Sequence, residues 1–230
     1  MRFQDASPDA RAIVYAGIQA DPLVAQAAAL LADGGHDERV LARAVMNGET
    51  TDADAWRAMF PSLFGPGAQA ADADAAGRAE AILAASLAVA DRGEQARSQY
   101  RGAIVESLTE ALVRRRHPGA ATSAVRRERR ILFDGVRAEI HPYDVTIELP
   151  DGAVAIDCKW GARGISADVL HQLDDARTHA AEEDDVPLAT ILVIFDAELS
   201  CAVRLERQTA PHETTQIVSL ETLDRLATAG

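Results

Sequence analysis

Apolar and polar residues alternate over residues 144–160, and this period of two is typical of β-strands with one buried face. The apolar positions are Val145, Ile147 and Leu149 in the first strand and Val154, Ile156, Cys158 and Trp160 in the second. An Asp-Gly pair at 151–152 predicts a type I′ hairpin loop, because that turn needs positive φ at both central residues. The resulting register pairs polar positions with one another: Asp144 with Lys159, and Thr146 with Asp157.

Three charged side chains of this hairpin are expected on one face of the sheet. Side chains on one face recur every second residue, so Asp144, Asp157 and Lys159 point to the same side. Two neighbouring carboxylates suit a hard divalent cation such as Mg²⁺ or Mn²⁺, which leaves its remaining positions to water and substrate phosphate. A lysine beside them can polarise the attacking water or stabilise negative charge on phosphorus. The alternative is a surface ion-pair ladder without a chemical role.

The motif formed by these residues resembles a known nuclease family. An acid on one strand, followed by a strand that ends in Asp157-Cys158-Lys159, is similar to the PD-(D/E)XK superfamily, which includes many restriction endonucleases and archaeal-type Holliday-junction resolvases. Upstream, Arg101-Gly102-x-x-x-Glu106 is similar to the helix that precedes the catalytic sheet in that family. The resemblance covers about residues 95–225. It implies an α/β fold with a restriction-endonuclease-like αβββαβ core and a mixed central sheet, preceded by an all-α N-terminal region.

The resemblance also implies a set of site residues. The catalytic set would be Glu106, Asp144, Asp157 and Lys159. The metal would be held by Asp144, Asp157, the backbone carbonyl of Cys158 and Glu106, with Glu110 as the substitute for Glu106. Substrate contacts would come from Arg101, Arg163 and Gln172. The chain departs from the family pattern at His141-Pro142-Tyr143-Asp144, which replaces an adjacent Pro-Asp, and at Gln172, which has no tyrosine four residues later.

Two glycine-containing segments flank this site in the sequence. Residues 100–113 carry an apolar stripe at helical spacing, and Gly102 lies inside that helix. A helical glycine costs about 1 kcal/mol relative to alanine, so Gly102 predicts close packing of the helix against the sheet or the substrate backbone. Residues 161–164, with two glycines, predict a flexible exit from the strand beside Lys159.

The remaining pattern predicts a helical first part and a sheet-containing second part, at residues 1–92 and 93–230 respectively. The first part should hold helices at 8–18, 22–32, 37–46, 52–60 and 72–91, with 65–71 as a linker. The second should add strands at 121–133, 136–140 and 189–195, peripheral strands at 201–205 and 216–218, and helices at 166–181 and 219–226. The acidic N-terminal helices suit a docking or dimerisation platform, or a structural cap on the catalytic core.

Charge and cysteine content narrow the function classes. A formal net charge of −13 argues against a protein that coats nucleic acid by bulk attraction. Only the central third is net positive, and its arginines favour either a solvated face or a rim that follows phosphates: Arg114, Arg115, Arg116, Arg126, Arg127, Arg129 and Arg130. Cys158 and Cys201 are too few for a disulfide framework or a thiolate zinc site. With no apolar run of about 18 residues and no signal sequence, we expect a cytoplasmic protein without membrane contact.

Together these patterns predict a Mg²⁺- or Mn²⁺-dependent phosphodiesterase that acts on nucleic acid, DNA rather than RNA. The family resemblance adds the expectation of a homodimer and of an effector role in a bacterial anti-phage or restriction system, and the acidic N-terminal helices add that of a partner protein, with the homodimer or in its place. Two alternatives remain open. One is a nuclease-like fold kept as a non-catalytic binding or assembly subunit, which the low overall basicity favours. The other is an RNA-cleaving toxin.

Overall fold

The computed structural model describes residues 1–6, 10–119, 121, 124–133, 136–137, 141–183, 187–210 and 214–228. It divides into two compact units: a helical unit, Ala10–Ala111, and a sheet unit that combines Met1–Asp9 with Leu112–Gly230. The division falls within one helix, α8 (Glu94–Arg116). The predicted boundary between 92 and 93 is corrected on two counts. The first residues belong to the sheet unit as strand β1 (Arg2–Asp5), and α8 contributes residues to both units.

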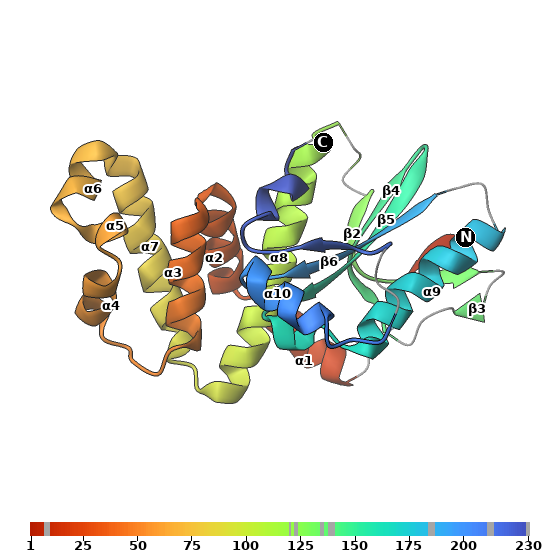
Figure 1. Cartoon of the computed structure of the whole chain (residues 1–230), viewed down its shortest axis with the longest axis horizontal. Coiled ribbons are helices and arrows are strands. Elements are labelled where there is room, and N and C mark those ends of the chain that lie inside the picture. The colour runs from red at the N-terminus through yellow and green to blue at the C-terminus, as the bar shows by residue number, and fades with distance from the viewer. Residues whose placement is uncertain are drawn as a thin grey trace. The chain divides into compact units, whose positions relative to one another are not determined.

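The helical unit consists of a series of helices that precede α8 (Figure 1): α1 (Ala10–Gln19), α2 (Pro22–Asp33), α3 (His36–Asn47), α4 (Ala53–Met59), α5 (Pro61–Phe64), α6 (Pro66–Ala71) and α7 (Ala73–Ala90). Aspartates that accept backbone N–H groups begin three of them: Asp21, Asp52 and Asp72. The predicted helices are therefore confirmed with small shifts at their ends. The predicted linker at 65–71 is wrong, because Pro66 occupies the first helical position and starts α6 there.

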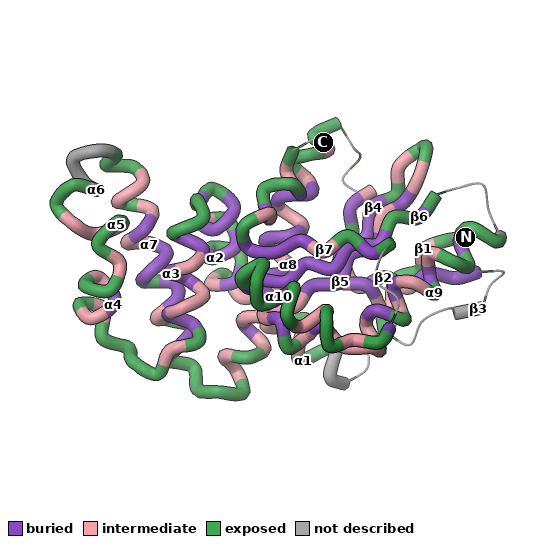
Figure 2. Tube along the Cα trace, viewed as in Figure 1, coloured by how far each residue is buried: buried purple, intermediate pink, exposed green. Residues whose placement is uncertain are grey.

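Aliphatic side chains form most of the core of the helical unit. The buried residues come mainly from α2, α3, α7 and α8 and include Val24, Leu31, Leu41, Val45, Ile82, Leu83, Ile104 and Leu108. Figure 2 shows the buried residues of these helices in purple. Among the described residues, no single helix is long and apolar enough to cross a membrane; only the bent pair Ile13–Gln19 and Pro22–Asp33 meets that criterion, and only together.

A mixed seven-stranded sheet organises the sheet unit. Its strand order is β1-β2-β4-β5-β6-β7, with β3 also paired to β2. The strands are β1, β2 (Val125–Phe133), β3 (Val136–Arg137), β4 (Tyr143–Leu149), β5 (Gly152–Lys159), β6 (Leu188–Ile194) and β7 (Gln216–Val218). Neighbours from β1 to β5 run antiparallel, whereas β5, β6 and β7 run parallel. The predicted α/β class with a mixed sheet is thus confirmed, and the predicted turn at 134–135 and residues 138–140 lie outside the described residues.

Helix α9 (Ala167–Glu183) makes the crossover between the parallel strands β5 and β6, which such strands need. Its buried face repeats at helical spacing: Leu170, Leu173, Ala176 and Ala180. These residues pack with Ala155, Leu192 and Ile194 of the sheet in one hydrophobic cluster. The predictions of a helix at 166–181 and a buried strand at 189–195 are confirmed.

The β4–β5 hairpin forms, but its register differs from the prediction by two residues. Leu149 pairs with Gly152 and Thr146 with Ala155, so the loop is Pro150-Asp151. Neither loop residue has positive φ, so the turn is not type I′. Proline, with φ fixed near −65°, suits the first central position of an ordinary turn. Gly152 serves another purpose, because a Cβ there would lie 3.2 Å from the Pro187 carbonyl oxygen.

The C-terminal region contains two further corrections. Residues 201–205 belong to helix α10 (Glu198–Leu205) and not to a strand, with Cys201 buried and Leu205 packed against the core four residues later. A five-residue segment with four apolar residues is too short to distinguish a helical from a strand period, and tertiary contacts decide between them. The predicted helix at 219–226 is a turn followed by the 3₁₀ helix η2 (Leu223–Leu226). The strand at 216–218 is confirmed as β7.

Candidate functional site

Three acidic residues lie at neighbouring positions on adjacent strands: Glu128 on β2, Asp144 on β4 and Asp157 on β5. The β2–β4 pairs on either side place Glu128 opposite Asp144, and these two carboxylates have oxygens within 4.8 Å of each other. Continuing the β4–β5 register by one residue places Asp157 beside Asp144. Since opposite residues of antiparallel strands share a face, the three carboxylates form one row across the sheet.

Asp144 is fixed by the backbone of β5. The N–H of Cys158 donates to its Oδ2 at 2.6 Å, next to the last ladder pair, Val145 with Ile156. In a strand, the N–H and the C=O of one residue point to the same edge. The Cys158 carbonyl therefore also faces the edge where Asp144 lies. The Cys158 side chain is buried as a free thiol, as the alternating pattern predicts.

Lys159 forms an ion pair at one end of this row. Its Nζ lies 2.6 Å from Oδ2 of Asp157, and the side chain is 29% exposed. Burial alone lowers the pKa of the Lys159 amine, but the carboxylates of Asp157 and Asp144 outweigh burial and raise that pKa above the ordinary lysine value. The amine is therefore an ammonium at neutral pH, able to donate hydrogen bonds and unable to accept a proton. The predicted convergence of Asp144, Asp157 and Lys159 is what the structure contains, despite the shifted register.

The segment after Lys159 is an ordered turn held by a hydrogen bond, and not the flexible segment that the sequence predicted. Residues Ala162–Gly164 form the 3₁₀ helix η1, and the Ala162 N–H donates to Oδ2 of Asp196 at 2.9 Å. Gly164 packs directly on the lysine, because a Cβ at position 164 would lie 2.6 Å from the Lys159 Cβ. The aliphatic stem of Lys159 is thus held by the turn that follows it.

Glu106 lies on α8 in the helical unit and is 5% exposed. The Tyr15 hydroxyl donates to its Oε1 at 2.5 Å, and Nε2 of Gln19 donates to its Oε2 at 2.8 Å. Gly102, one turn earlier on α8, would carry a Cβ 3.0 Å from the Tyr15 hydroxyl oxygen. The predicted close packing at Gly102 is present, but the neighbour named for it is corrected: the glycine makes room for a tyrosine of α1.

The three predicted substrate-binding residues occupy different surroundings. Arg101 donates to Oδ1 of Asn47 at 2.8 Å within the helical unit. Gln172 donates through Nε2 to the His141 carbonyl at 3.2 Å, at the entry to β4. Arg163 is exposed on η1. Of the three, Arg163 is therefore the side chain that the sheet unit presents to solvent near Lys159. The substitute acid, Glu110, is half-buried on α8.

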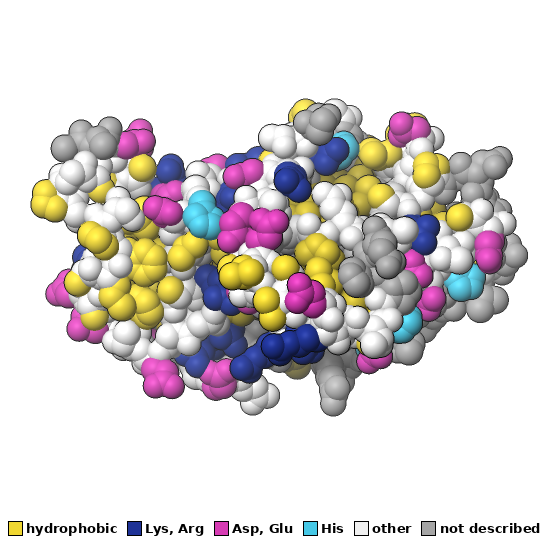
Figure 3. All heavy atoms as spheres, in the orientation of Figure 1, with side chains coloured by type: hydrophobic (Ala, Val, Ile, Leu, Met, Phe, Trp, Pro, Cys, Tyr) yellow, Lys and Arg dark blue, Asp and Glu magenta, His cyan; other side chains and the backbone are white. Residues whose placement is uncertain are grey.

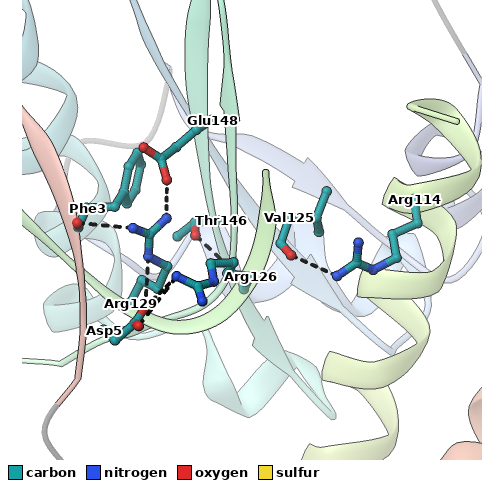
Figure 4. Close-up of polar contacts among 8 residues, drawn as sticks. All are labelled: Phe3, Asp5, Arg114, Val125, Arg126, Arg129, Thr146 and Glu148. Carbon is teal, nitrogen blue, oxygen red and sulfur yellow. Dashed lines mark hydrogen bonds and ion pairs between the residues drawn. The ribbon is translucent and has the colours of Figure 1, made fainter. Parts of the chain in front are cut away.

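Several arginines of the predicted basic rim are engaged by protein groups (Figure 4). Arg129 is nearly buried, forms ion pairs with Glu148 and Asp5, and donates to the Phe3 carbonyl at 3.1 Å. Arg126 lies 3.5 Å from Asp5. On the face drawn in Figure 3, basic side chains occur in small groups between acidic ones. Arg126 and Arg129 of β2 are thus paired with acids of the neighbouring strands: Asp5 of β1 and Glu148 of β4.

Sequence reasoning missed Glu128 and Asp196. Glu128 is the single acid among four arginines on β2, and this pattern could have drawn attention to it in the sequence. Its position opposite Asp144 depends on a long-range strand register, which the sequence does not specify. Its φ of 53° is left-handed, although the β2–β4 register is unchanged on both sides. Non-glycine residues in this region are strained, and such residues cluster at functional sites. Asp196 lies two residues after the end of β6 and accepts a hydrogen bond from the Ala162 N–H of η1, a contact that also depends on the tertiary fold.

Strain at Glu128 leads to an expected result for two substitutions. Glu128→Gly should be more stable than Glu128→Ala by about 1 kcal/mol, because left-handed φ penalises a Cβ. Both variants lose the carboxylate, and both should bind Mn²⁺ more weakly than the wild type. Urea unfolding and calorimetric Mn²⁺ titration measure the two effects. An Ala variant as stable as the Gly variant would contradict the strain, and unchanged Mn²⁺ binding would contradict a role for this carboxylate.

Lys159 is distinguished by the composition of the chain. It is the only lysine, and every other basic side chain, histidine aside, is an arginine. A lysine carries a compact ammonium on a flexible stem, whereas arginine carries a planar fork. The one ammonium side chain of the chain therefore lies beside two carboxylates, where all other cationic side chains apart from histidine are guanidinium groups.

Comparison of the chain with protein-family models, with curated proteins and with solved structures gives no match. Function is therefore inferred from the carboxylates and the ammonium of the sheet unit, and from the groups that surround Glu106 in the helical unit.

Proposed function

We propose that this protein is a divalent-metal-dependent nuclease of the PD-(D/E)XK type that hydrolyses phosphodiester bonds, with DNA as its substrate. The observation that carries the proposal is the placement of Asp144, Asp157 and Lys159 on one face at the end of the β4–β5 hairpin, with the Lys159 ammonium 2.6 Å from Asp157. Two acids and an ammonium at this point stabilise a sheet poorly, because the carboxylates repel one another. They suit the chemistry of a phosphate ester.

The acidic groups fit a hard metal ion such as Mg²⁺ or Mn²⁺. Glu128 and Asp144 of the sheet unit are acidic residues with oxygens within 4.8 Å of each other, and Asp157 adds a carboxylate next to Asp144. Oxygen donors of this kind are the ligands that Mg²⁺ prefers. In the proposal, Asp144 and Asp157 would bind the ion with the Cys158 carbonyl, and the family resemblance adds Glu106 of the helical unit as a further oxygen ligand. The ion would lower the pKa of a bound water and offset charge on the phosphate.

Lys159 acts in this proposal as a charged donor. Its raised pKa keeps the amine protonated next to Asp157 and Asp144. An ammonium placed there can orient the attacking water through a hydrogen bond and stabilise negative charge that develops on the phosphoryl oxygens. The η1 turn and Gly164 hold the stem of the side chain, so the ammonium has a defined position before substrate binds.

The order of elements supports the same assignment. Along the chain, α8 is followed by β2, β4, β5, α9 and β6, with the short β3 after β2. This is the αβββαβ order that the PD-(D/E)XK resemblance implies, with the acid-x-Lys motif at the end of β5. The proposed role in anti-phage defence or restriction and the proposed homodimer follow from that resemblance alone, and the proposed partner protein follows from the acidic N-terminal helices.

A second candidate is a nuclease-like subunit that binds or assembles without cutting. The engagement of Arg126 and Arg129 by Asp5 and Glu148 favours it, because these cations are not free for phosphates. The net charge of −13 favours it as well. Binding of a divalent ion separates the two candidates, since an assembly subunit has no need of one.

Metal dependence tests the proposal. We expect the purified protein to nick or linearise plasmid in Mg²⁺ or Mn²⁺, and excess EDTA to abolish cleavage. Calorimetry should detect binding of Mn²⁺ in the range from micromolar to millimolar, and a parallel panel of duplex DNA, single-stranded DNA and tRNA should identify the substrate. Cleavage of tRNA alone would replace DNA with RNA as the substrate. An intact fold that binds neither ion would overturn the proposal in favour of the assembly subunit.

A further inference from the structure

Two side chains of helix α1 hold the carboxylate of Glu106. Tyr15 and Gln19 are four residues apart, so they lie on one face of the helix. Each donates to a different oxygen: the Tyr15 hydroxyl to Oε1 at 2.5 Å and the Gln19 amide to Oε2 at 2.8 Å. The contact joins residues about ninety positions apart within the helical unit, and it fixes the orientation of both carboxylate oxygens.

Neither donor carries charge. Among the side chains that the structure describes, the hydrogen-bond donors to Glu106 are a phenol and an amide, although the residue is only 5% exposed. A buried carboxylate kept for structure alone is normally paired with a cation. Each oxygen of a carboxylate offers two lone pairs, so one hydrogen bond per oxygen leaves further acceptor sites. The arrangement therefore orients the carboxylate and leaves it able to bind a cation.

Gly102 completes the arrangement. It lies four residues before Glu106 on α8, and a Cβ at this position would lie 3.0 Å from the Tyr15 hydroxyl oxygen and 4.0 Å from Oε1 of Glu106. Any side chain at 102 would push the phenol away from the carboxylate. A helix interior disfavours glycine, so its presence beneath Tyr15 is explained by this approach.

We infer that Tyr15 and Gln19 are positioning residues for Glu106, and that α1 is thereby part of the metal-binding apparatus. The inference rests on the proposed function, in which Glu106 is a metal ligand. Carboxylate ligands are usually hydrogen-bonded in turn, and removal of such partners typically lowers metal affinity or activity about 10- to 100-fold. Helix α1 would then contribute to catalysis without touching the substrate.

Metal titration of single variants tests this inference. Tyr15→Phe removes only the hydroxyl, and Gln19→Met removes the amide at similar volume. Each should raise the Mn²⁺ or Mg²⁺ concentration for half-maximal cleavage about tenfold and weaken calorimetric Mn²⁺ binding equally. Cleavage at saturating metal should change little. A purely structural role would lower the unfolding temperature and leave the metal requirement unchanged.

Two further variants sharpen the result. Gly102→Ala should raise the metal requirement in the wild-type background but add nothing to Tyr15→Phe, because the methyl group then has no hydroxyl to displace. Tyr100→Phe is the matched control, since that hydroxyl donates to Asp21 and not to Glu106. It should affect stability alone.

The outcomes separate the inference from its premise. A wild type without any metal response overturns the proposed function and this inference with it. A raised metal requirement in Glu106→Gln, with normal requirements in Tyr15→Phe and Gln19→Met, overturns the inference and leaves the proposed function standing. Shifts in all three, with a normal Tyr100→Phe, support both.

Discussion

Asp157→Asn is expected to lower the rate of metal-dependent DNA cleavage by about 10³-fold. The substitution keeps the shape of the side chain and removes a charged ligand. It also removes the ion pair that holds the Lys159 ammonium at 2.6 Å. Metal binding and placement of the ammonium, the two functions proposed for the row, should therefore fail together. Plasmid cleavage at saturating Mg²⁺ and at saturating Mn²⁺ measures the effect.

The same variant should remain folded. Asp144 still contributes a negative charge near Lys159, and repulsion between the two carboxylates is relieved, so we expect a loss of about 1–2 kcal/mol rather than the 3–5 kcal/mol of a fully orphaned buried charge. Bound metal stabilises only the native state of a protein that binds it. Mn²⁺ should therefore raise the unfolding temperature of the wild type and not that of Asp157→Asn. Equal cleavage and equal Mn²⁺ stabilisation in both proteins would contradict the assignment.

The grouping of Asp144, Asp157 and Lys159 was predictable because it depends on a period and not on a register. Side chains alternate with period two, so a slip of two residues in the hairpin leaves every side chain on its own face. The turn type was predicted wrongly for a local reason: Pro150 fixes its own φ, whereas Gly152 faces the Pro187 carbonyl of another segment. The strand pattern therefore defined the site better than the turn that joins the strands.

Contacts that depend on tertiary pairing could not be predicted. Glu128 reaches Asp144 only through the β2–β4 register, and Tyr15 reaches Glu106 across more than ninety residues of sequence. Strand β1 is four residues long and is held by its pairing with β2, a partner that its own pattern does not specify. The candidate site residues of β4 and β5 could be predicted from the strand pattern. The residues that orient or supplement them, such as Tyr15 and Glu128, could be identified only from the three-dimensional fold.

Gly164→Ala is expected to reduce cleavage about 100-fold, although residue 164 touches neither metal nor substrate. A Cβ at this position would lie 2.6, 2.7 and 2.9 Å from the Cβ, Cγ and Cδ of Lys159. These atoms are the base of the side chain and cannot swing aside, so the lysine stem or the η1 turn must shift. A displacement of about 1 Å in a catalytic group can cost 10²-fold in rate. Crowding should also cost about 1–3 kcal/mol of stability.

Gly161, three residues before Gly164, provides the matched control. Gly161 begins the same turn with an extended backbone, φ −153°, and a Cβ there would lie 3.5 Å from Oδ2 of Asp196, an ordinary contact. Gly161→Ala should therefore cleave DNA at nearly the wild-type rate. Because Lys159 does not hold the metal in the proposed mechanism, Gly164→Ala should lower kcat and leave the Mn²⁺ requirement unchanged, unlike Asp157→Asn. Wild-type kcat in a folded Gly164→Ala variant would contradict a role for the Lys159 ammonium, since its position could then change without consequence.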